Sequence, residues 1–366
     1  MPKLSQPTTT APQVEFVVSV PLDLMNAMYF TSLVEQNEGI DGWPAEVRKE
    51  ADPELLAELD FLFTFPKGQP GVMGALTDRL LAHPEAWQDV DALIRFVGSL
   101  PLGVGESAAA VEIQGLAFYS VCSPFDSTEQ ESDPRAQPRE ALTEALEKAD
   151  VDVAAALAVY DQPEELRTRM VRLIERFYEQ HYRRDLPRRL PCLERSVAAH
   201  QNRRVEDVNS LARELTGRTA SCLETACVGP YTKLIFAPSL DMGPYVSCAD
   251  VPPIHGLIYP CEAEFMGAAP EEAEKTRRLA RIYKALGDEQ RLHILQMLHG
   301  REMYAQEIVE LTGLHQSVVS RHHTFMTAVG LLTARREGNM KFFSLNPEMG
   351  NELQRTLELF GAGVPS

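Results

Sequence analysis

The sequence predicts a mainly α-helical protein with small β elements, an α+β fold in two parts. The N-terminal part is large, mostly helical and carries a small antiparallel sheet; the C-terminal part is compact. Apolar residues recur at helical spacing over most of the 366 residues. Short β-branched runs are confined to Val14–Val20 and to residues 230–261. The Gly- and Pro-containing segment Gly267–Pro270 then separates the two parts as a hinge.

These signals divide the chain into four expected segments. Residues 1–13 are polar and rich in Pro and Thr, which predicts a disordered tail. Residues 14–269 form the N-terminal domain, and residues 270–348 form the C-terminal domain. Residues 349–366 complete the chain as a helix and tail. By its position alone, the N-terminal domain is expected to serve as a sensor or oligomerisation domain.

The N-terminal domain opens with a strand over Val14–Val20 and a helix from Pro21 to about Val34, since proline is favoured in the first turn of a helix. A polar, proline-bearing segment, Ser123–Pro138, is expected to be a loop. Between proline and glycine breaks, amphipathic patterns predict further helices over Pro53–Leu62, Gly71–Ala82, Asp89–Ser99, Glu106–Val121 and Pro138–Ala149.

A second helical block, Val151–Thr216, contains 11 arginines between Arg167 and Arg204. This basic segment could bind phosphate groups or an anionic effector. Acidic residues are interleaved with the arginines, and apolar residues recur at helical spacing among them. The favoured interpretation is therefore a solvated helix face laced with salt bridges.

The composition changes after residue 230. Short β-rich runs cover Tyr231–Pro238, Tyr245–Cys248 and His255–Pro260, with prolines and glycines between them. They predict a small antiparallel sheet, or strands that pair with Val14–Val20.

The net charge of −18 would normally argue against binding to nucleic acid, but its distribution reverses that conclusion. Residues 271–366 contain 12 basic and 12 acidic side chains, so the first 270 residues carry the whole excess of negative charge. Within the neutral C-terminal part, basic side chains gather where a phosphate backbone would lie. They are Lys275, Arg277, Arg278, Arg281 and Lys284, followed by Arg321, Arg335, Arg336 and Lys341.

The C-terminal pattern begins with a helix from Pro270 to Leu286. Asp288 is a good N-cap for a helix over Gln290–His299, whose Leu292, Ile294, Leu295 and Leu298 should face inward, and Gly300 ends it. A short helix over Ala305–Leu311 and a tight turn at Thr312–Leu314 precede another helix.

This next helix has an apolar stripe of Val319, Phe325, Met326 and Val329, which leaves a polar face near its N-terminus. Short polar groups and long donors there are the side chains that contact base edges in a major groove.

After this helix, Leu332–Arg335 and Lys341–Leu345 predict two strands around a turn at Glu337–Asn339. They form a basic hairpin that can contact the DNA backbone or minor groove. The order is that of a winged helix-turn-helix. The DNA-binding candidates are His315, Gln316, Ser317, Ser320, Arg321, His322, Arg335, Arg336, Asn339 and Lys341. Of the adjacent histidines, His322 and His323, one is expected to pack and one to face phosphate, because neighbours on a helix point apart.

Residues 276–347 resemble the ArsR-type family of bacterial winged-helix repressors. The resemblance is carried by Ala285-Leu286-Gly287-Asp288 with Arg291-Leu292, by Ser317-Val318-Val319-Ser320-Arg321-His322, by Gly330-Leu331-Leu332 and by Arg335-Arg336-Glu337-Gly338. It implies a homodimer that binds an inverted repeat in double-stranded DNA, usually as a repressor released by a small-molecule or protein effector. A cytoplasmic, nucleoid-associated location is expected, since Met1–Gln13 has no signal-peptide pattern. The long N-terminal part is similar to the extension of large ArsR-like regulators, on weaker matches at Phe236–Ser239 and Leu257–Pro260.

Two positions depart from the family pattern. The helix before recognition reads Glu302–Glu307 and lacks the Cys-x-Cys pair common in the family's metal sensors. His323 stands where the family has a buried leucine.

Alternative functions remain open at this point. Cys192, Cys222, Cys227, Cys248 and Cys261, with His255, could sense metal or thiol chemistry, although no CxxC pair exists and reduced, isolated thiols are favoured. A regulator controlled by a protein partner is equally compatible. An enzyme is not expected, because Gly103–Ser107 lacks the spacing of a phosphate-binding loop and no catalytic constellation is evident. No cofactor is expected, nor membrane association, since no apolar run spans a bilayer.

Overall fold

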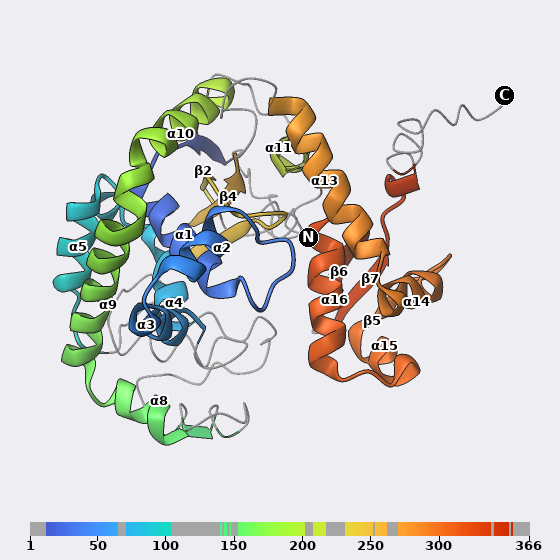
Figure 1. Ribbon diagram of the computed structural model, residues 1–366, viewed down its shortest axis with the longest axis horizontal. Helices are drawn as coiled ribbons and strands as arrows, with labels where there is room; N and C mark the ends of the chain where they lie inside the picture. Colours follow the sequence, from blue (N-terminus) through green and yellow to red (C-terminus); the bar gives the residue numbers. More distant parts are fainter. Residues whose placement is uncertain are drawn as a thin grey trace, which may run out of the picture.

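The computed structural model describes residues 12–64, 71–103, 153–201, 208–216, 231–251, 253–261, 270–337 and 340–350, together with 140, 143, 144, 147 and 353. Within these ranges the protein is mainly helical with two small sheets, as the sequence predicts. The helices of the N-terminal domain surround its sheet, and α13 (Pro270–Leu286) leads to the C-terminal unit at the other side of the molecule (Figure 1). No helix in the described ranges is long and apolar enough to cross a bilayer.

The N-terminal sheet has four strands in the order β1-β2-β4-β3: β1 (Gln13–Phe16), β2 (Lys233–Ser239), β3 (Ser247–Val251) and β4 (Ile254–Pro260). β1 pairs with β2, as one sequence alternative predicted, and ends four residues before the predicted Val20. The prediction of an antiparallel sheet is wrong for most of it. β1, β2 and β4 run parallel, and β3 alone pairs antiparallel. Parallel neighbours need long crossovers, and strand composition does not show which crossovers the chain makes.

α1 (Val20–Leu33) is the central helix of the N-terminal domain. Ser19 caps it by accepting a hydrogen bond from the Leu22 amide, and 12 of its 14 residues are buried. A helix buried on all sides belongs to the core of a domain and not to its surface. Against it pack α2 (Trp43–Glu50), α3 (Pro53–Thr64), α4 (Gly71–Leu80) and α5 (Val90–Gly98). The other described helices of this domain are η1 (Pro84–Ala86), α8 (Val153–Tyr160), α9 (Pro163–Phe177), η2 (Tyr178–Tyr182), η3 (Arg183–Asp185), α10 (Leu186–His200) and α11 (Val208–Thr216). The predictions over 106–121 and 123–138 lie outside the described residues.

Several arginines of the basic segment pair with carboxylates at partly exposed positions, as the favoured interpretation predicted. Arg169 forms a two-pronged bond to Glu58, and Arg184 bonds Glu50. The same holds for Arg176, which binds Asp52, and for Arg183, which binds Glu179 one helical turn away.

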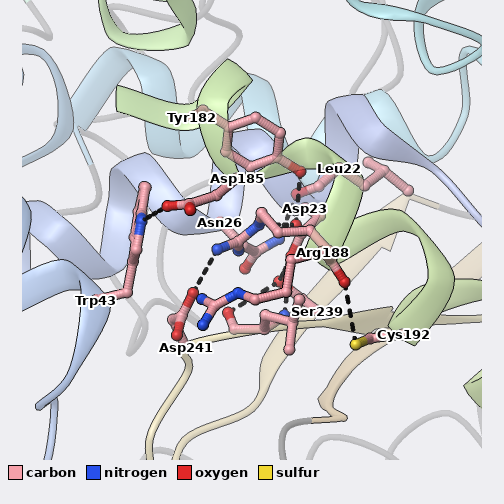
Figure 2. A network of polar contacts seen from close by, with 12 residues as sticks. Leu22, Asp23, Asn26, Trp43, Tyr182, Asp185, Arg188, Cys192, Ser239 and Asp241 are labelled. Atoms are coloured by element: carbon pink, nitrogen blue, oxygen red, sulfur yellow. Dashed lines mark hydrogen bonds and ion pairs between the residues drawn. The ribbon is translucent and has the colours of Figure 1, made fainter. Parts of the chain in front are cut away.

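Arg189 is the exception, because its side chain is fully buried. Its Nε donates to Asp23 at 2.8 Å, and its Nη1 donates to Asp241 at 2.5 Å (Figure 2). Its guanidinium also lies between the rings of Trp43 and Tyr182, at 4.9 and 4.8 Å from their centroids.

Asp23 is the acceptor at the centre of this buried ion cluster. Beside Arg189, it accepts hydrogen bonds from Tyr182 Oη at 2.6 Å, Ser239 Oγ at 2.7 Å and the Leu240 amide at 2.8 Å. A buried charge is stable only when paired and hydrogen-bonded. The cluster therefore ties α1 and α10 to the chain that leaves β2.

The C-terminal unit has the order of a winged helix-turn-helix. Its elements are α13, α14 (Glu289–Met297), β5 (Met303–Tyr304), α15 (Ala305–Thr312), α16 (Gln316–Ala328), β6 (Leu332–Glu337) and β7 (Met340–Leu345), with sheet order β5-β7-β6. Asp288 caps α14 as predicted, accepting from the Arg291 amide at 3.0 Å. Ile294 and Leu298 are buried in the core of the unit, whereas Leu292 is 42% exposed, so its predicted inward orientation is wrong.

The described cysteines differ in state. Cys192 and Cys261 are buried and are not disulfide-bonded. Cys248 is disulfide-bonded, so the expectation of reduced thiols is wrong at this position. A disulfide depends on how the fold brings two thiols together, which spacing along the sequence does not show. No group of three or more His, Cys, Asp or Glu side chains that could hold a metal ion occurs among the described residues.

Candidate nucleic-acid interface

The candidate recognition helix is α16, and the turn before it is built by local capping. α15 ends at Gly313, whose φ of 65° is the left-handed conformation that glycine adopts without strain. His315 then caps α16, since its Nδ1 accepts from the Ser317 amide at 3.3 Å and lies 2.8 Å from Ser317 Oγ. These contacts fix where the polar end of α16 begins.

The two faces of α16 divide as the sequence predicted. Val319, Phe325, Met326 and Val329 are buried in the unit. His315, Gln316, Ser317, Ser320 and Arg321 are exposed. The structure therefore brings five of the predicted site residues together on one open, N-terminal end of the helix.

His322 does not belong to that open face. It is 5% exposed, and its Nε2 lies 3.0 Å from Gln290 Oε1 on α14. His323 is also buried, at 3%, and stacks on the Phe343 ring of β7 with centroids 4.0 Å apart. The expectation that one histidine of the pair faces phosphate is wrong, because α14 and β7 cover both sides of the helix at this level.

Burial sets the charge of both histidines. It lowers the pKa of His323 to about 4, helped by the positive charge of Lys341. Burial also lowers the pKa of His322, against the attraction of Asp288. Both rings are therefore neutral near pH 7.

The predicted wing is a hairpin of β6 and β7. Arg335 is exposed but bonded to Glu302, with Nε to Oε2 at 2.7 Å, and its guanidinium lies 4.6 Å from the Phe342 ring centroid. Lys341 is exposed, with its Nζ 5.5 Å from the Phe343 ring centroid. Arg336 lies on β6, but the description does not extend to its side chain, and Asn339 lies outside the described residues.

The basic residues of α13 are placed differently from the prediction that they face phosphate. Arg281 is 8% exposed, and its Nη2 lies 3.4 Å from Asp41 of the N-terminal domain. Lys284 Nζ lies 4.0 Å from Glu38 of the same segment. The side chains of Lys275 and Arg277 lie outside the described residues. At Arg281 the prediction is wrong, because a carboxylate of the chain itself occupies the place assigned to DNA.

Sequence reasoning missed the residues that join the two parts of the protein. Arg291 of α14 is 4% exposed and donates from Nη2 to both carboxylate oxygens of Glu38, at 3.0 Å each. Its guanidinium also lies 4.9 Å from the centroid of the Phe325 ring on α16. The sequence around Glu38 carries only a turn signal, Asn37-Glu38-Gly39, and nothing in it indicates a partner 253 residues away.

Comparison with known proteins gives matches over the C-terminal unit. A family model described as "Bacterial regulatory protein, arsR family" matches residues 288–333. The arsenical resistance operon repressor of Staphylococcus xylosus is 30% identical over 83 residues, which are 23% of this chain and 80% of the relative. The transcriptional activator HlyU of Vibrio cholerae is 32% identical over 90 residues, 24% of this chain and 81% of the relative.

Solved structures match the same quarter of the chain. HlyU from Vibrio cholerae has a TM-score of 0.21 and 27% identity, covering 25% of this chain and 95% of that one. The homodimeric winged helix-turn-helix DNA-binding domain Mb0332 from Mycobacterium bovis has a TM-score of 0.23 and 27% identity, covering 26% of this chain and 88% of that one.

Proposed function

Because this chain belongs to the ArsR family of bacterial regulatory proteins, we propose that it is a sequence-specific DNA-binding repressor that acts as a homodimer at the nucleoid and is controlled through its N-terminal domain. The observation that carries the proposal is the open end of α16. Gln316, Ser317, Ser320 and Arg321 are exposed there, on a helix whose apolar face is buried. Polar side chains at the N-terminal end of a recognition helix are those that contact bases.

In this proposal the parts of the interface have different tasks. Arg321 and Gln316 read base edges, and Ser317 and Ser320 contact bases or nearby phosphates. The wing adds Lys341 and Arg336 as contacts to the backbone or minor groove. Two recognition helices, one from each protomer, would bind the halves of an inverted repeat about one helical turn apart, roughly 34 Å.

The sign of regulation is proposed from the relatives. Two arsenical resistance operon repressors match this chain, at 30% and 29% identity, which favours repression. Activation is the second candidate, since a relative at 32% identity is a transcriptional activator. Transcription from the promoters that the protein occupies, measured with and without the gene, separates the two: repression predicts higher transcription in its absence.

Arg321→Ala tests the DNA contact itself. Loss of a bidentate base contact should weaken binding to a selected operator by about 1–3 kcal/mol, roughly 5- to 150-fold, and relax specificity at one position. Arg95→Ala is the matched control, because it removes the same charge from an exposed position on α5 in the N-terminal domain. Gel-shift titration measures both. Equal affinities for Arg321→Ala and Arg95→Ala would remove Arg321 from the interface.

A further inference from the structure

The segment between α1 and α2, residues 34–42, contacts the C-terminal unit at its acidic side chains. Glu38 binds Arg291 through both carboxylate oxygens and lies 4.0 Å from Lys284. Three residues later, Asp41 lies 3.4 Å from Arg281. We call residues 34–42 the clamp loop. Two of its carboxylates, those of Glu38 and Asp41, meet three basic side chains of α13 and α14.

The clamp loop also touches the recognition helix directly. A Cβ placed on Gly39 would lie 2.9 Å from Cε2 of Phe325 on α16, so the loop backbone packs against that ring. One turn further along α16, Ala328 is 6% exposed and belongs to the hydrophobic core cluster of the N-terminal domain. The second half of α16 is therefore packed against the N-terminal domain.

The Arg291 guanidinium contacts both Glu38 of the clamp loop and Phe325 of α16. Its planar group lies over the Phe325 ring at 4.9 Å and donates from its edge to the Glu38 carboxylate, with only 4% of the residue exposed. Because the Arg291 side chain is buried and that of Glu38 is 29% exposed, the pair is screened less by solvent than one at the surface. Glu38 therefore acts on α16 through Arg291 without touching a base-reading residue.

The clamp loop is itself supported by a rigid neighbour. Tyr245 Oη donates to the Glu38 carbonyl at 2.6 Å, and a Cβ on Gly243 would lie 2.4 Å from the Gly39 carbonyl oxygen. Residues 241–245 are in turn anchored by Asp241, which is bonded to the buried Arg189 (Figure 2). A side chain can fix another element only if its own support is rigid.

The contact leaves the reading end of α16 open. His315 to Ser317, Ser320 and Arg321 are exposed while Phe325 and Ala328 are covered. The clamp loop contacts the C-terminal half of α16 and leaves the N-terminal end open to DNA. It fixes the direction in which that end points.

On the basis of the proposed function, we propose that Glu38 is a positioning residue for DNA recognition: from the N-terminal domain it holds the recognition helix, through Arg291, in one orientation. In a dimer, this fixes the distance and angle between the two reading ends. The N-terminal domain then determines which half-site spacing the protein accepts, while the residues of α16 determine which bases it reads.

Glu38→Gln in the full-length protein tests this. The amide keeps the shape of the side chain and removes the charge that holds Arg291. Glu35→Gln is the matched control, since Glu35 lies in the same loop, is 77% exposed and pairs with Arg48 within the N-terminal domain. Each variant is titrated against an operator selected from random DNA and against versions with one to five base pairs added or removed between the half-sites.

The wild type and Glu35→Gln are expected to bind one spacing and to lose affinity steeply at the others. Glu38→Gln should lose about 5- to 150-fold at the selected spacing, the usual range of coupling between sites, and show a flattened spacing profile with unchanged affinity for a single half-site. Glu38→Asp keeps the charge on a side chain one methylene shorter, so it should show a smaller loss and a spacing profile between those of the wild type and Glu38→Gln. If Glu38→Gln does not fold, this partial flattening in Glu38→Asp is the test. A spacing profile identical to that of the wild type in the folded variant overturns the proposal.

A second measurement needs no DNA. Hydrogen exchange of the amides of residues 322–329 should become faster in Glu38→Gln and stay unchanged in Glu35→Gln, because the clamp would release this half of α16. If the exchange of these amides is unchanged in Glu38→Gln, the proposed role of Glu38 is wrong, whatever the DNA titrations show. If the wild type selects no DNA at all, the proposed function fails, and hydrogen exchange still decides whether Glu38 holds the helix.

Discussion

At the scale of single residues, the buried side chain of His323 makes the stability of the protein depend on pH. Its pKa is about 4 in the folded protein and near 6.5 in an unfolded chain. Above pH 6.5 both states are neutral and the histidine has no pH-dependent effect. As the pH falls from 6.5 to 4, the unfolded state takes up the proton first, so stability is lost through that window.

His323→Leu removes this titration. The stability of the wild type relative to the variant should fall by about 2 kcal/mol between pH 7 and pH 5, as that shift implies. Urea unfolding of both proteins at the two pH values measures it, and effects of other groups such as His322 cancel in the difference. If the difference in the free energy of unfolding between wild type and variant is the same at both pH values, the pKa of His323 is not lowered in the folded protein.

Asp23 is the residue on which the buried ion cluster depends. Asp23→Asn replaces an acceptor of four hydrogen bonds by an amide and leaves the Arg189 charge poorly compensated in the core. Removing one partner of a buried pair costs about 3–5 kcal/mol in the free energy of unfolding. Glu58→Gln breaks a partly exposed pair with Arg169 and should cost less than about 1 kcal/mol. Similar losses for the two variants, by urea unfolding, would contradict the structural role of Asp23.

At the scale of elements, the wing offers a test between two cations. Lys341→Ala should lower the slope of log affinity against log salt concentration by about 0.9, the value of one phosphate contact. Arg335→Ala should lower it less, because Glu302 already neutralises that guanidinium. Titrations at four salt concentrations measure the slopes. If Arg335→Ala has the larger effect, Glu302 releases its partner when DNA binds.

Elements with local signals were predictable. Helices α14 and α15 begin and end within one or two residues of expectation, because Asp288, Gly300 and Gly313 act on the backbone next to them. The open face of α16 followed from its apolar stripe. The burial of Arg189 was not predictable, since in the sequence it is one more arginine of a basic run, and Arg169, Arg176, Arg183 and Arg184 of the same run pair with carboxylates at partly exposed positions.

Contacts between segments that are distant in the sequence could not be predicted either. Glu38 and Arg291 are 253 residues apart, and no periodicity links them. The strand register of the N-terminal sheet could not be predicted for the same reason, because the partners of β1 come more than 200 residues later in the sequence.

At the scale of the whole molecule, the proposed mode of binding requires two chains. Light scattering should give a mass about twice 40.8 kDa in solution. The same sample bound to a two-fold operator should hold two protomers, and an operator cut to one half-site should bind far more weakly. A mass of one chain across a concentration series, with full affinity for a single half-site, would exclude the dimeric reading mode.

The parallel pairing of β1 with β2 also constrains how the protein is made. Gln13 lies opposite Lys233, so the first strand leaves the ribosome 220 residues before its neighbour exists. At about 5–20 residues per second, that is a wait of roughly 10 to 45 s. During this time the buried surface of α1 has no sheet to pack on, whereas α14 to β7 can fold as soon as they are synthesised. Protection by chaperones during translation should therefore matter for the first two thirds of the chain and not for the last.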